Sequence, residues 1–108
     1  MARPQKIRMV SEEPGVNYFK PRAVPLSELE EVTIKVDEFE ALRLNDLEKL
    51  SQAEAAEKMK VHQSTVQRIL ESARQKIADA LCNGKAIRIE GGMYRTFSRG
   101  RNRFRGGW

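Results

Sequence analysis

The sequence has one cysteine and one histidine among its 108 residues. A single cysteine, Cys82, cannot form a disulfide within the chain, and with His62 alone it cannot build an all-Cys/His zinc site. A reducing, cytoplasmic environment is therefore expected. No stretch approaches the roughly 20 apolar residues of a membrane-spanning helix, and the first ten residues lack the apolar core of a signal peptide. We expect a soluble protein that does not partner with a membrane.

Signatures of catalysis are also missing. His62 has no matching serine and aspartate arrangement around it, and no glycine-rich loop of the GxxxxGK type occurs. Asp37, Glu38 and Glu40 are close enough in sequence for a catalytic carboxylate pair. Acidic residues at the start of a helix are, however, more typical of a solvated face that complements the helix dipole. Neither an enzyme nor a bound cofactor is expected.

Charge is distributed unevenly along the chain. The net charge is +5 at pH 7, but residues 1–25 carry a net +3, residues 26–59 a net −6 and residues 60–108 a net +8. Positive charge therefore collects in the C-terminal half, where it would attract a polyanion such as nucleic acid. The acidic middle is expected to support that half.

The clearest helical pattern spans residues 51–81 and is interrupted once. Ser51 and Glu54 have the spacing of a capping box, so a first helix is predicted to begin at Ser51. Residues 60–62 break the pattern and are too few for anything but a sharp turn between two steeply packed helices. A second helix is predicted to begin near Gln63.

The second helix has two chemically different faces. Asn83 and Gly84 supply the left-handed residue that commonly ends a helix, and Cys82 beside them is expected to be a small buried residue. One face is apolar at the helical period and is predicted to pack on the core. Its side chains are Val66, Ile69, Leu70, Ala73, Ile77, Ala80 and Leu81. The opposite face is polar.

Amide and guanidinium groups gather in the first half of the polar face. Such groups make bidentate hydrogen bonds to adenine and guanine edges, and the first turns of a recognition helix enter the major groove. The residues predicted to contact bases are Gln63, Ser64, Gln67 and Arg68. Those predicted to contact DNA phosphates nearby are Lys60, Thr65, Arg74 and Lys76. An ordinary exposed helix face is the alternative interpretation.

Two resemblances rest on these residues. The segment SQAEAAEKMKVHQSTVQRILESARQKI, residues 51–77, resembles the helix-turn-helix of region four of bacterial sigma factors. Residues 3–92 resemble a small uncharacterised prokaryotic family of predicted DNA-binding proteins. Lys60 stands where such motifs commonly have glycine, and His62 where they have a Ser or Thr cap. The resemblance implies double-stranded DNA as partner and, because sigma region-four domains also contact it, RNA polymerase as a second candidate.

Further elements are predicted between residue 32 and the tail. VTIKV, residues 32–36, alternates as a strand does, and its expected partner is AIRIE, residues 86–90. So small a ribbon must pack on the helices or pair between two chains, and the second arrangement would make a homodimer. Asp37 and Glu40 predict a capping box that opens a helix of about ten residues.

The first 31 residues carry weaker signals. Residues 3–10 alternate faintly and are predicted to form an edge strand. Tyr18 and Phe19, in a proline-rich loop, are expected to anchor on the helical core. Ser27 and Glu30 have the spacing of another capping box, which predicts a short turn of helix.

The last sixteen residues, 93–108, contain four aromatic residues and no acidic one. Without an amphipathic period they cannot bury enough apolar surface to fold, so a flexible tail is predicted. Its arginines are expected to contact phosphates. They are Arg95, Arg99, Arg101, Arg103 and Arg105. A solubilising tail without specific contacts is the alternative.

Together these patterns predict a mainly α-helical fold, a sigma region-four-like helix-turn-helix with a small β element and a basic flexible tail. Residues 1–36 would form an N-terminal extension, residues 37–92 the helix-turn-helix domain with its following strand, and residues 93–108 the tail. The predicted function is sequence-specific binding of double-stranded DNA in transcription regulation. RNA or single-strand binding led by the tail, and a protein-interaction adaptor, are the alternatives.

Overall fold

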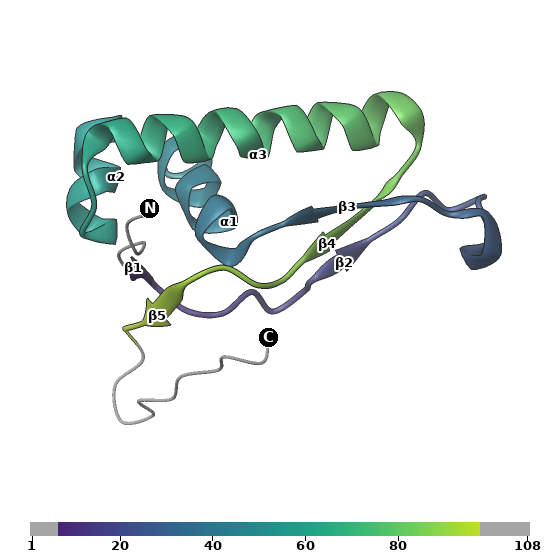
Figure 1. Ribbon diagram of the computed structural model, residues 1–108, viewed down its shortest axis with the longest axis horizontal. Helices are drawn as coiled ribbons and strands as arrows, with labels where there is room; N and C mark the ends of the chain where they lie inside the picture. The colour runs from purple at the N-terminus through teal and green to yellow at the C-terminus, as the bar shows by residue number, and fades with distance from the viewer. Residues whose placement is uncertain (1–6, 98–108) are drawn as a thin grey trace, which may run out of the picture.

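The computed structural model describes residues 7–97 of the chain. Within them, α3 lies along one face of a small sheet, and α1 and α2 pack across its N-terminal half (Figure 1). In chain order the elements are β1 (Arg8–Val10), β2 (Tyr18–Phe19), the 3₁₀ turn η1 (Leu26–Glu28), β3 (Glu31–Ile34), α1 (Val36–Leu42), the π-helical η2 (Arg43–Leu47), α2 (Gln52–Met59), α3 (Gln63–Asn83), β4 (Ala86–Ile89) and β5 (Tyr94–Thr96). The fold therefore combines helices with two small sheets.

The break between α2 and α3 lies where the sequence predicts it. The Glu54 N–H donates to Ser51 Oγ at 3.0 Å and the Ser51 N–H donates to Glu54 Oε1 at 2.9 Å, so the predicted capping box of α2 is confirmed. Lys60 ends α2 in the left-handed conformation, with φ 61°. Gly84 ends α3 in the same conformation, as predicted, with φ 63°. Three residues thus separate the two helices.

The start of α1 differs from the prediction. Its first residue is Val36, and the preceding Lys35 N–H donates to Glu38 Oε1 at 2.9 Å. The predicted box between Asp37 and Glu40 is therefore wrong, because the cap residue is Lys35, two residues earlier than predicted, and Glu38 takes the place that was predicted for Glu40. The helical path then continues to Leu47 as η2, with the wider π geometry.

The larger sheet has the strand order β2–β4–β3, and α3 packs on it. β3 and β4 are parallel, with Ile34 aligned to Ile89, whereas β2 is antiparallel to β4. The predicted pairing of residues 32–36 with residues 86–90 is confirmed within one chain. β3 nevertheless ends at Ile34, because Val36 already belongs to α1.

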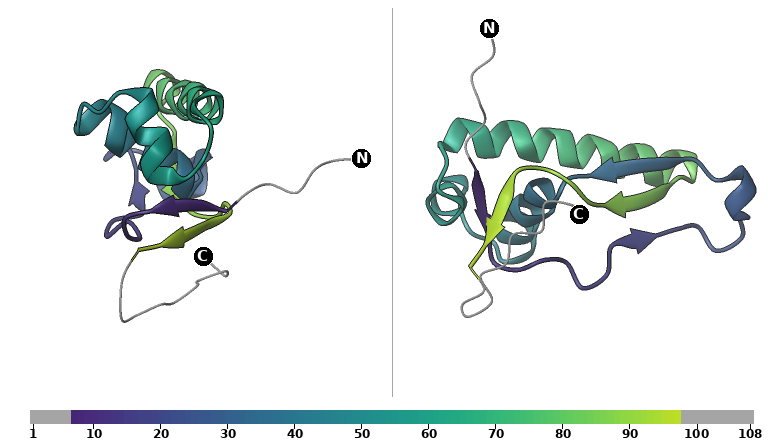
Figure 2. Two further views of the ribbon diagram at one scale, coloured as in Figure 1. Left: turned by 90° about the vertical axis from the view of Figure 1, so that its left-hand side faces the viewer. Right: turned by 60° about the horizontal axis from the view of Figure 1, so that its bottom comes forward.

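The smaller sheet pairs β1 with β5 in parallel, on the side of α1 away from α3 (Figures 1 and 2). Of the edge strand predicted over residues 3–10, β1 covers Arg8–Val10, and residues 3–6 lie outside the described part. Tyr94 of β5 is only 5% exposed and packs with Val10. The prediction of a flexible tail is therefore wrong for Tyr94–Thr96, and residues 98–108 lie outside the described part.

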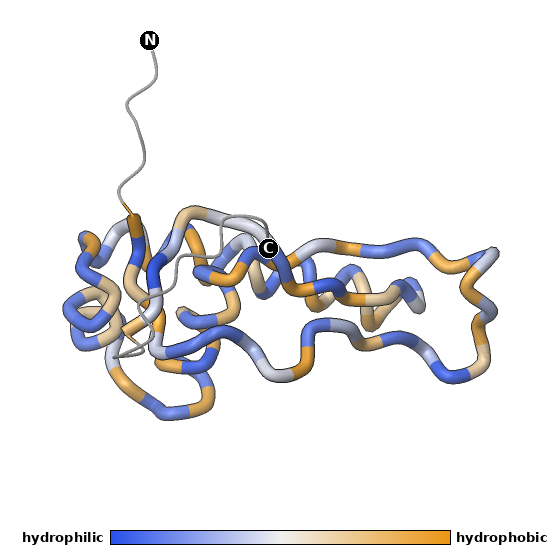
Figure 3. Tube along the Cα trace, turned by 90° about the horizontal axis from the view of Figure 1, so that it is seen from below, coloured by the Kyte–Doolittle hydropathy of each residue, from blue (hydrophilic) through white to orange (hydrophobic). Residues whose placement is uncertain are grey.

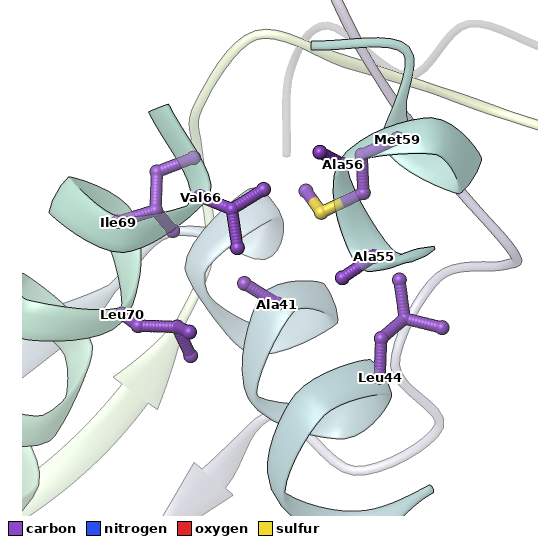
Figure 4. Close-up of a cluster of buried hydrophobic side chains, with 8 residues drawn as sticks. All are labelled: Ala41, Leu44, Ala55, Ala56, Met59, Val66, Ile69 and Leu70. Atoms are coloured by element: carbon purple, nitrogen blue, oxygen red, sulfur yellow. The ribbon is translucent and has the colours of Figure 1, made fainter. Parts of the chain in front are cut away.

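Two apolar clusters hold these elements together. One joins α1, η2, α2 and the first half of α3 (Figure 4). Its buried residues are Ala41, Leu44, Ala55, Ala56, Met59, Val66, Ile69 and Leu70. The other joins the two sheets to the start of α1 and contains Val10, Ile34, Val36, Ile89 and Tyr94. In Figure 3 hydrophobic and hydrophilic residues alternate over short intervals, as expected of elements that each bury one face.

The acidic residues at the start of α1 are buried, so the predicted solvated face is wrong. Asp37, Glu38 and Glu40 are 5%, 5% and 3% exposed. β1 and α3 cover them, and each carboxylate meets a basic side chain. The pairs are Arg8–Asp37 at 3.5 Å, Lys76–Glu38 at 2.9 Å and Arg43–Glu40 at 2.9 Å. The first two pairs connect segments that are distant in sequence, whereas Arg43 and Glu40 are only three residues apart.

Two predictions fail at the end of α3. Leu81 is 76% exposed and Cys82 is also exposed, although both were expected on the buried side. The last turns of α3 extend past α1 and α2 and meet only the sheet (Figure 1). Only Ala80 is buried in those last turns, so the covered stripe is narrower than at the other end.

Two predictions also fail near the N-terminus. The 3₁₀ turn η1 follows Pro25 without a side-chain cap, so Ser27 and Glu30 do not form the expected box. Phe19 is 52% exposed and Tyr18 is half-buried, because both lie in β2 at the edge of the sheet and not on the helical core. Neither residue serves as the predicted anchor.

Candidate nucleic-acid interface

The outer face of α3 presents every residue that the sequence predicts for base contact. Arg68 forms no ion pair with a described residue, and its Nη2 lies 3.5 Å from Thr65 Oγ1, at the limit of a hydrogen bond. Its guanidinium is therefore available to an external acceptor. The exposed residues of this face are Gln63, Ser64, Gln67 and Arg68.

The buried side of α3 fixes the direction of that face. Val66 and Leu70 are 0% and 1% exposed, and they pack against α1 and α2 (Figure 4). Ala56 and Met59 supply the α2 side of this contact. Because these apolar contacts lie opposite the polar side chains, the first half of α3 cannot rotate without exposing its core residues. The polar row is consequently presented on a rigid support.

The start of α3 is also favourable to an anion. His62 precedes the helix but provides no side-chain cap. The N–H groups of Gln63 and Ser64 have no acceptor among residues 7–97, so they add to the positive end of the helix dipole. Lys60 is exposed in the turn just before them. This turn can therefore neutralise a phosphate.

Lys58 belongs to the same basic region and was not among the predicted contacts. It is exposed in the last turn of α2, two residues before Lys60, and has no ion pair with a described residue. Its position just before the predicted turn could have indicated from the sequence that it lies close to the start of α3. Glu71 is the first acidic residue along α3, so the part of α3 from Gln63 to Leu70 carries no negative charge.

Three of the residues predicted to contact phosphates are paired within the protein or partly covered. Arg74 is occupied, because its Nη2 donates to Asp46 Oδ1 at 2.6 Å and to Asn45 Oδ1 at 3.0 Å. The hydrogen bond that Arg74 donates to Asp46 is the main cause of a raised pKa for Arg74. Lys76 is likewise held by Glu38, and Thr65 is half-buried beside Arg68.

The predicted arginine contacts of the tail lie apart from this face or outside the described residues. Arg95 is exposed on β5, which is separated from α3 by α1 (Figure 2). The structure therefore does not bring Arg95 to the outer face of α3. The others, which lie outside residues 7–97, are Arg99, Arg101, Arg103 and Arg105.

Other kinds of site have little support in the described part of the chain. Within residues 7–97 no three His, Cys, Asp or Glu side chains come close enough to hold a metal ion. Over the same residues, none of the helices combines the length and the apolar character needed to cross a membrane.

Comparison with known proteins gives consistent matches along nearly the whole chain. The sequence model described as "Protein of unknown function DUF134" matches residues 1–97. A UPF0251 protein of Caldanaerobacter subterraneus subsp. tengcongensis is 57% identical, over 100% of this chain and 96% of the relative. A UPF0251 protein of Thermoanaerobacter pseudethanolicus is also 57% identical, over 98% and 90%. One from Dehalococcoides mccartyi strain BAV1 is 54% identical, over 92% and 85%. No solved structure matches the chain.

Proposed function

The chain belongs to the family of proteins of unknown function DUF134, and we propose that it binds double-stranded DNA in a sequence-specific manner through the first half of α3. In this proposal α2, the turn and α3 act as a helix-turn-helix. One observation carries the proposal. The amide and guanidinium side chains of Gln63, Gln67 and Arg68 are exposed on one side of a helix that is fixed by buried contacts on the other.

The chemistry of this row suits base edges in the major groove. A guanidinium such as that of Arg68 can donate two hydrogen bonds to guanine O6 and N7, and the amides of Gln63 and Gln67 can pair with adenine N6 and N7. A major groove about 12 Å wide admits one α-helix. Because the helix is held rigidly by its apolar side, these donors would meet the bases in a defined register.

The turn supplies contacts that do not depend on sequence. Lys58 and Lys60 are exposed beside the uncapped N–H groups of α3, so a DNA phosphate could be bound there while the helix lies in the groove. Phosphate contacts fix the orientation of the protein, and base contacts provide the specificity. The two groups of residues are adjacent in this protein, as docking of a recognition helix requires.

The test compares one base-contact residue with one tail residue. A preferred duplex would first be selected from random DNA by the wild-type protein. Arg68→Ala is expected to lose about 1–3 kcal/mol of preference for one base pair of that duplex, while Arg101→Ala should weaken selected and random duplexes alike. Fluorescence anisotropy at several salt concentrations measures both effects. Equal losses on both duplexes for Arg68→Ala would rule out base readout by this residue.

The same measurements distinguish the other functions compatible with the sequence. Preference for single-stranded DNA or RNA that depends on Arg101 and not on Arg68 would favour binding led by the tail. No affinity for any nucleic acid at low salt would favour a protein-interaction adaptor, with RNA polymerase as the first partner to examine. Under the proposal itself, the protein acts in the cytoplasm as a transcription regulator.

A further inference from the structure

The outer edge of β3 is open. In the sheet order β2–β4–β3, β2 and β3 are the two edges, and among the described residues β3 pairs only with β4. β2 pairs over two residues and is followed by Lys20 and Pro21, so it offers little backbone for further pairing. β3 is four residues long and continues directly into Lys35. It is therefore the edge at which another strand could add.

The backbone of β3 has hydrogen-bonding groups directed to that open side. The Ala86 N–H donates to Glu30 O at 2.8 Å and the Glu90 N–H donates to Ile34 O at 3.0 Å, so the even-numbered residues face β4. Alternation along a strand turns the N–H and C=O groups of Glu31 and Thr33 the other way. Neither backbone N–H has an acceptor among residues 7–97. Unpaired groups of this kind are a template for strand pairing.

The sequence at this edge is complementary to itself. If two copies pair in antiparallel fashion with Thr33 opposite Thr33, then Glu31 of each copy lies opposite Lys35 of the other. Val32 lies opposite Ile34 in the same register. Cross-strand pairs of opposite charge and of β-branched residues both stabilise a sheet, by roughly 0.2–1 kcal/mol each. Lys35 is exposed and has no ion pair with a described residue, so its ammonium group is available.

We propose that two copies of this protein form a dimer through antiparallel pairing of β3 with β3, centred on Thr33. The paired strands would join the two three-stranded sheets into one of six strands. Glu31 would keep its two hydrogen bonds from Arg88 and the one from Tyr18, since a carboxylate has acceptor capacity for the Lys35 ammonium as well. The edge strand would then be covered, and it could no longer pair with the strands of other proteins.

The dimer would place the two α3 helices at a spacing that lets both contact the same side of a DNA duplex. This consequence of the dimer rests on the proposed function. The two-fold axis of an antiparallel strand pair is perpendicular to the sheet, so helices on the same face of the sheet direct their outer sides the same way. Ile77 of α3 packs against the cluster that contains Ile34, next to Thr33. Gln67 lies ten residues before Ile77, about 15 Å along the helix. α3 runs roughly along β3 (Figure 1), so two copies of Gln67 would be about 30 Å apart, close to the ~34 Å of one DNA turn.

Disulfide trapping without DNA tests the interface directly. The exposed Cys82 is first replaced by Ser, and Thr33→Cys is then introduced. Opposed residues of a hydrogen-bonded antiparallel pair have Cα atoms about 5.5 Å apart, within the range that a disulfide spans. Lys35→Cys on the same background is the matched control, because two copies of residue 35 would be about 14 Å apart. Mild oxidation should cross-link the first variant to near completion and leave the control monomeric on a non-reducing gel.

Sedimentation equilibrium of the full chain provides the second measurement. The wild-type mass should be twice the 12.4 kDa of the chain, and Thr33→Pro, which removes an outward N–H without touching the bonds to β4, should halve it. Circular dichroism checks that this variant is folded, and Lys35→Glu, which places like charges opposite each other, should also shift the protein towards the monomer. A monomeric wild type, or a dimer that survives both changes without cross-linking at residue 33, would overturn the proposal. These results do not depend on DNA, so they are separate from the test of base readout.

Discussion

Arg74 Nη2 lies 2.6 Å from Asp46 Oδ1, and this ion pair joins the middle of α3 to η2. Both side chains are nearly half exposed, at 49% and 44%, so the pair adds little to stability. Its main consequence concerns binding, because a guanidinium that is already paired is not free to neutralise a phosphate. Among residues 7–97, the basic residues near the outer face of α3 that have no ion pair are Lys58, Lys60 and Arg68.

Replacement of Arg74 therefore tests this assignment. Arg74→Ala should leave the dependence of DNA affinity on salt concentration unchanged, whereas Lys58→Ala should reduce its slope by about 0.9 if one phosphate contact is lost. Asp46→Asn, which releases Arg74, should make the slope steeper than in the wild type. The measurement is the dissociation constant of a random duplex over a salt series. A shallower slope in Arg74→Ala would mean that Arg74 leaves Asp46 when DNA binds.

Glu38 is the acceptor that holds the start of α1 to α3. It accepts hydrogen bonds from the Lys35 N–H at 2.9 Å, from Ser72 Oγ at 2.6 Å and from Lys76 Nζ at 2.9 Å. Glu38→Ala should lower the free energy of unfolding by about 2–4 kcal/mol, somewhat less than a fully buried pair because the Lys76 side chain is 30% exposed. Urea denaturation measures the loss.

The control for this variant is Glu57→Ala, on the exposed side of α2. Glu57 has no ion pair or side-chain hydrogen bond with a described residue, so its removal should change stability by less than about 0.5 kcal/mol. Similar losses of unfolding free energy in the two variants would show that the contacts of Glu38 with Ser72 and Lys76 do not stabilise the fold.

Asp37 should give the protein a stability component that falls as pH rises. Burial raises the pKa of this carboxyl above its ordinary 3.8, and the charge of Arg8 opposes the rise only in part. A raised folded-state pKa means that the native state holds the proton more tightly than the unfolded state. The contribution is therefore complete below pH 3.8 and is lost as pH rises through the folded-state pKa.

Asp37→Asn isolates this component. The unfolding free energy of the wild type minus that of the variant should be constant below pH 3.8, decrease as pH rises above it and then level off. The neighbouring Glu38 behaves differently. Burial raises the pKa of Glu38, but the hydrogen bonds from Ser72 and Lys76 outweigh burial and leave that pKa lowered, so the contribution of Glu38 to stability depends on pH with the opposite sign. The part of that dependence that comes from Ser72 and Lys76 is present in both proteins and cancels in the difference. Urea titrations across acidic pH measure it, and a difference that increases with pH would refute the assignment.

The parts of the fold that could be predicted from the sequence are those with local signals. Ser51 and Glu54 are three residues apart, and Gly84 ends α3 by its own conformational freedom, so neither needed distant information. The exposure of Gln67 and Arg68 followed from the helical period alone. These residues define the candidate interface, so its polar row can be predicted from the sequence although its surroundings cannot.

The parts that could not be predicted depend on contacts between distant residues. Lys76 and Glu38 are 38 positions apart, and an acidic helix start has the same sequence pattern whether solvent or another element covers it. β1 aligns Arg8 with Tyr94, a pairing for which the arginine-rich tail gives no sign. The pairing of Arg74 with Asp46 has the same origin, so no local pattern indicates that Arg74 and Lys76 are held by carboxylates.

Lys60 has a backbone role and a proposed binding role, and substitution can separate them. Its φ of 61° and ψ of 43° are in the left-handed region, which is unfavourable for a residue with a Cβ by roughly 1–2 kcal/mol. Lys60→Gly should therefore raise the unfolding free energy by up to about 1 kcal/mol, after allowance for the greater freedom of glycine in the unfolded chain. Lys60→Ala keeps the Cβ and should not be more stable than the wild type. Thermal denaturation of both variants measures this difference.

Both variants remove the same charge, so their DNA binding should change equally. If the ammonium of Lys60 contacts a phosphate beside the start of α3, each variant should reduce the salt slope by about 0.9 and weaken selected and random duplexes alike. A more stable Lys60→Gly protein with a reduced slope would show that lysine is held in a strained turn for the sake of its charge. A more stable protein with an unchanged slope would instead remove Lys60 from the interface, and Lys58 would then be the basic residue that the turn provides.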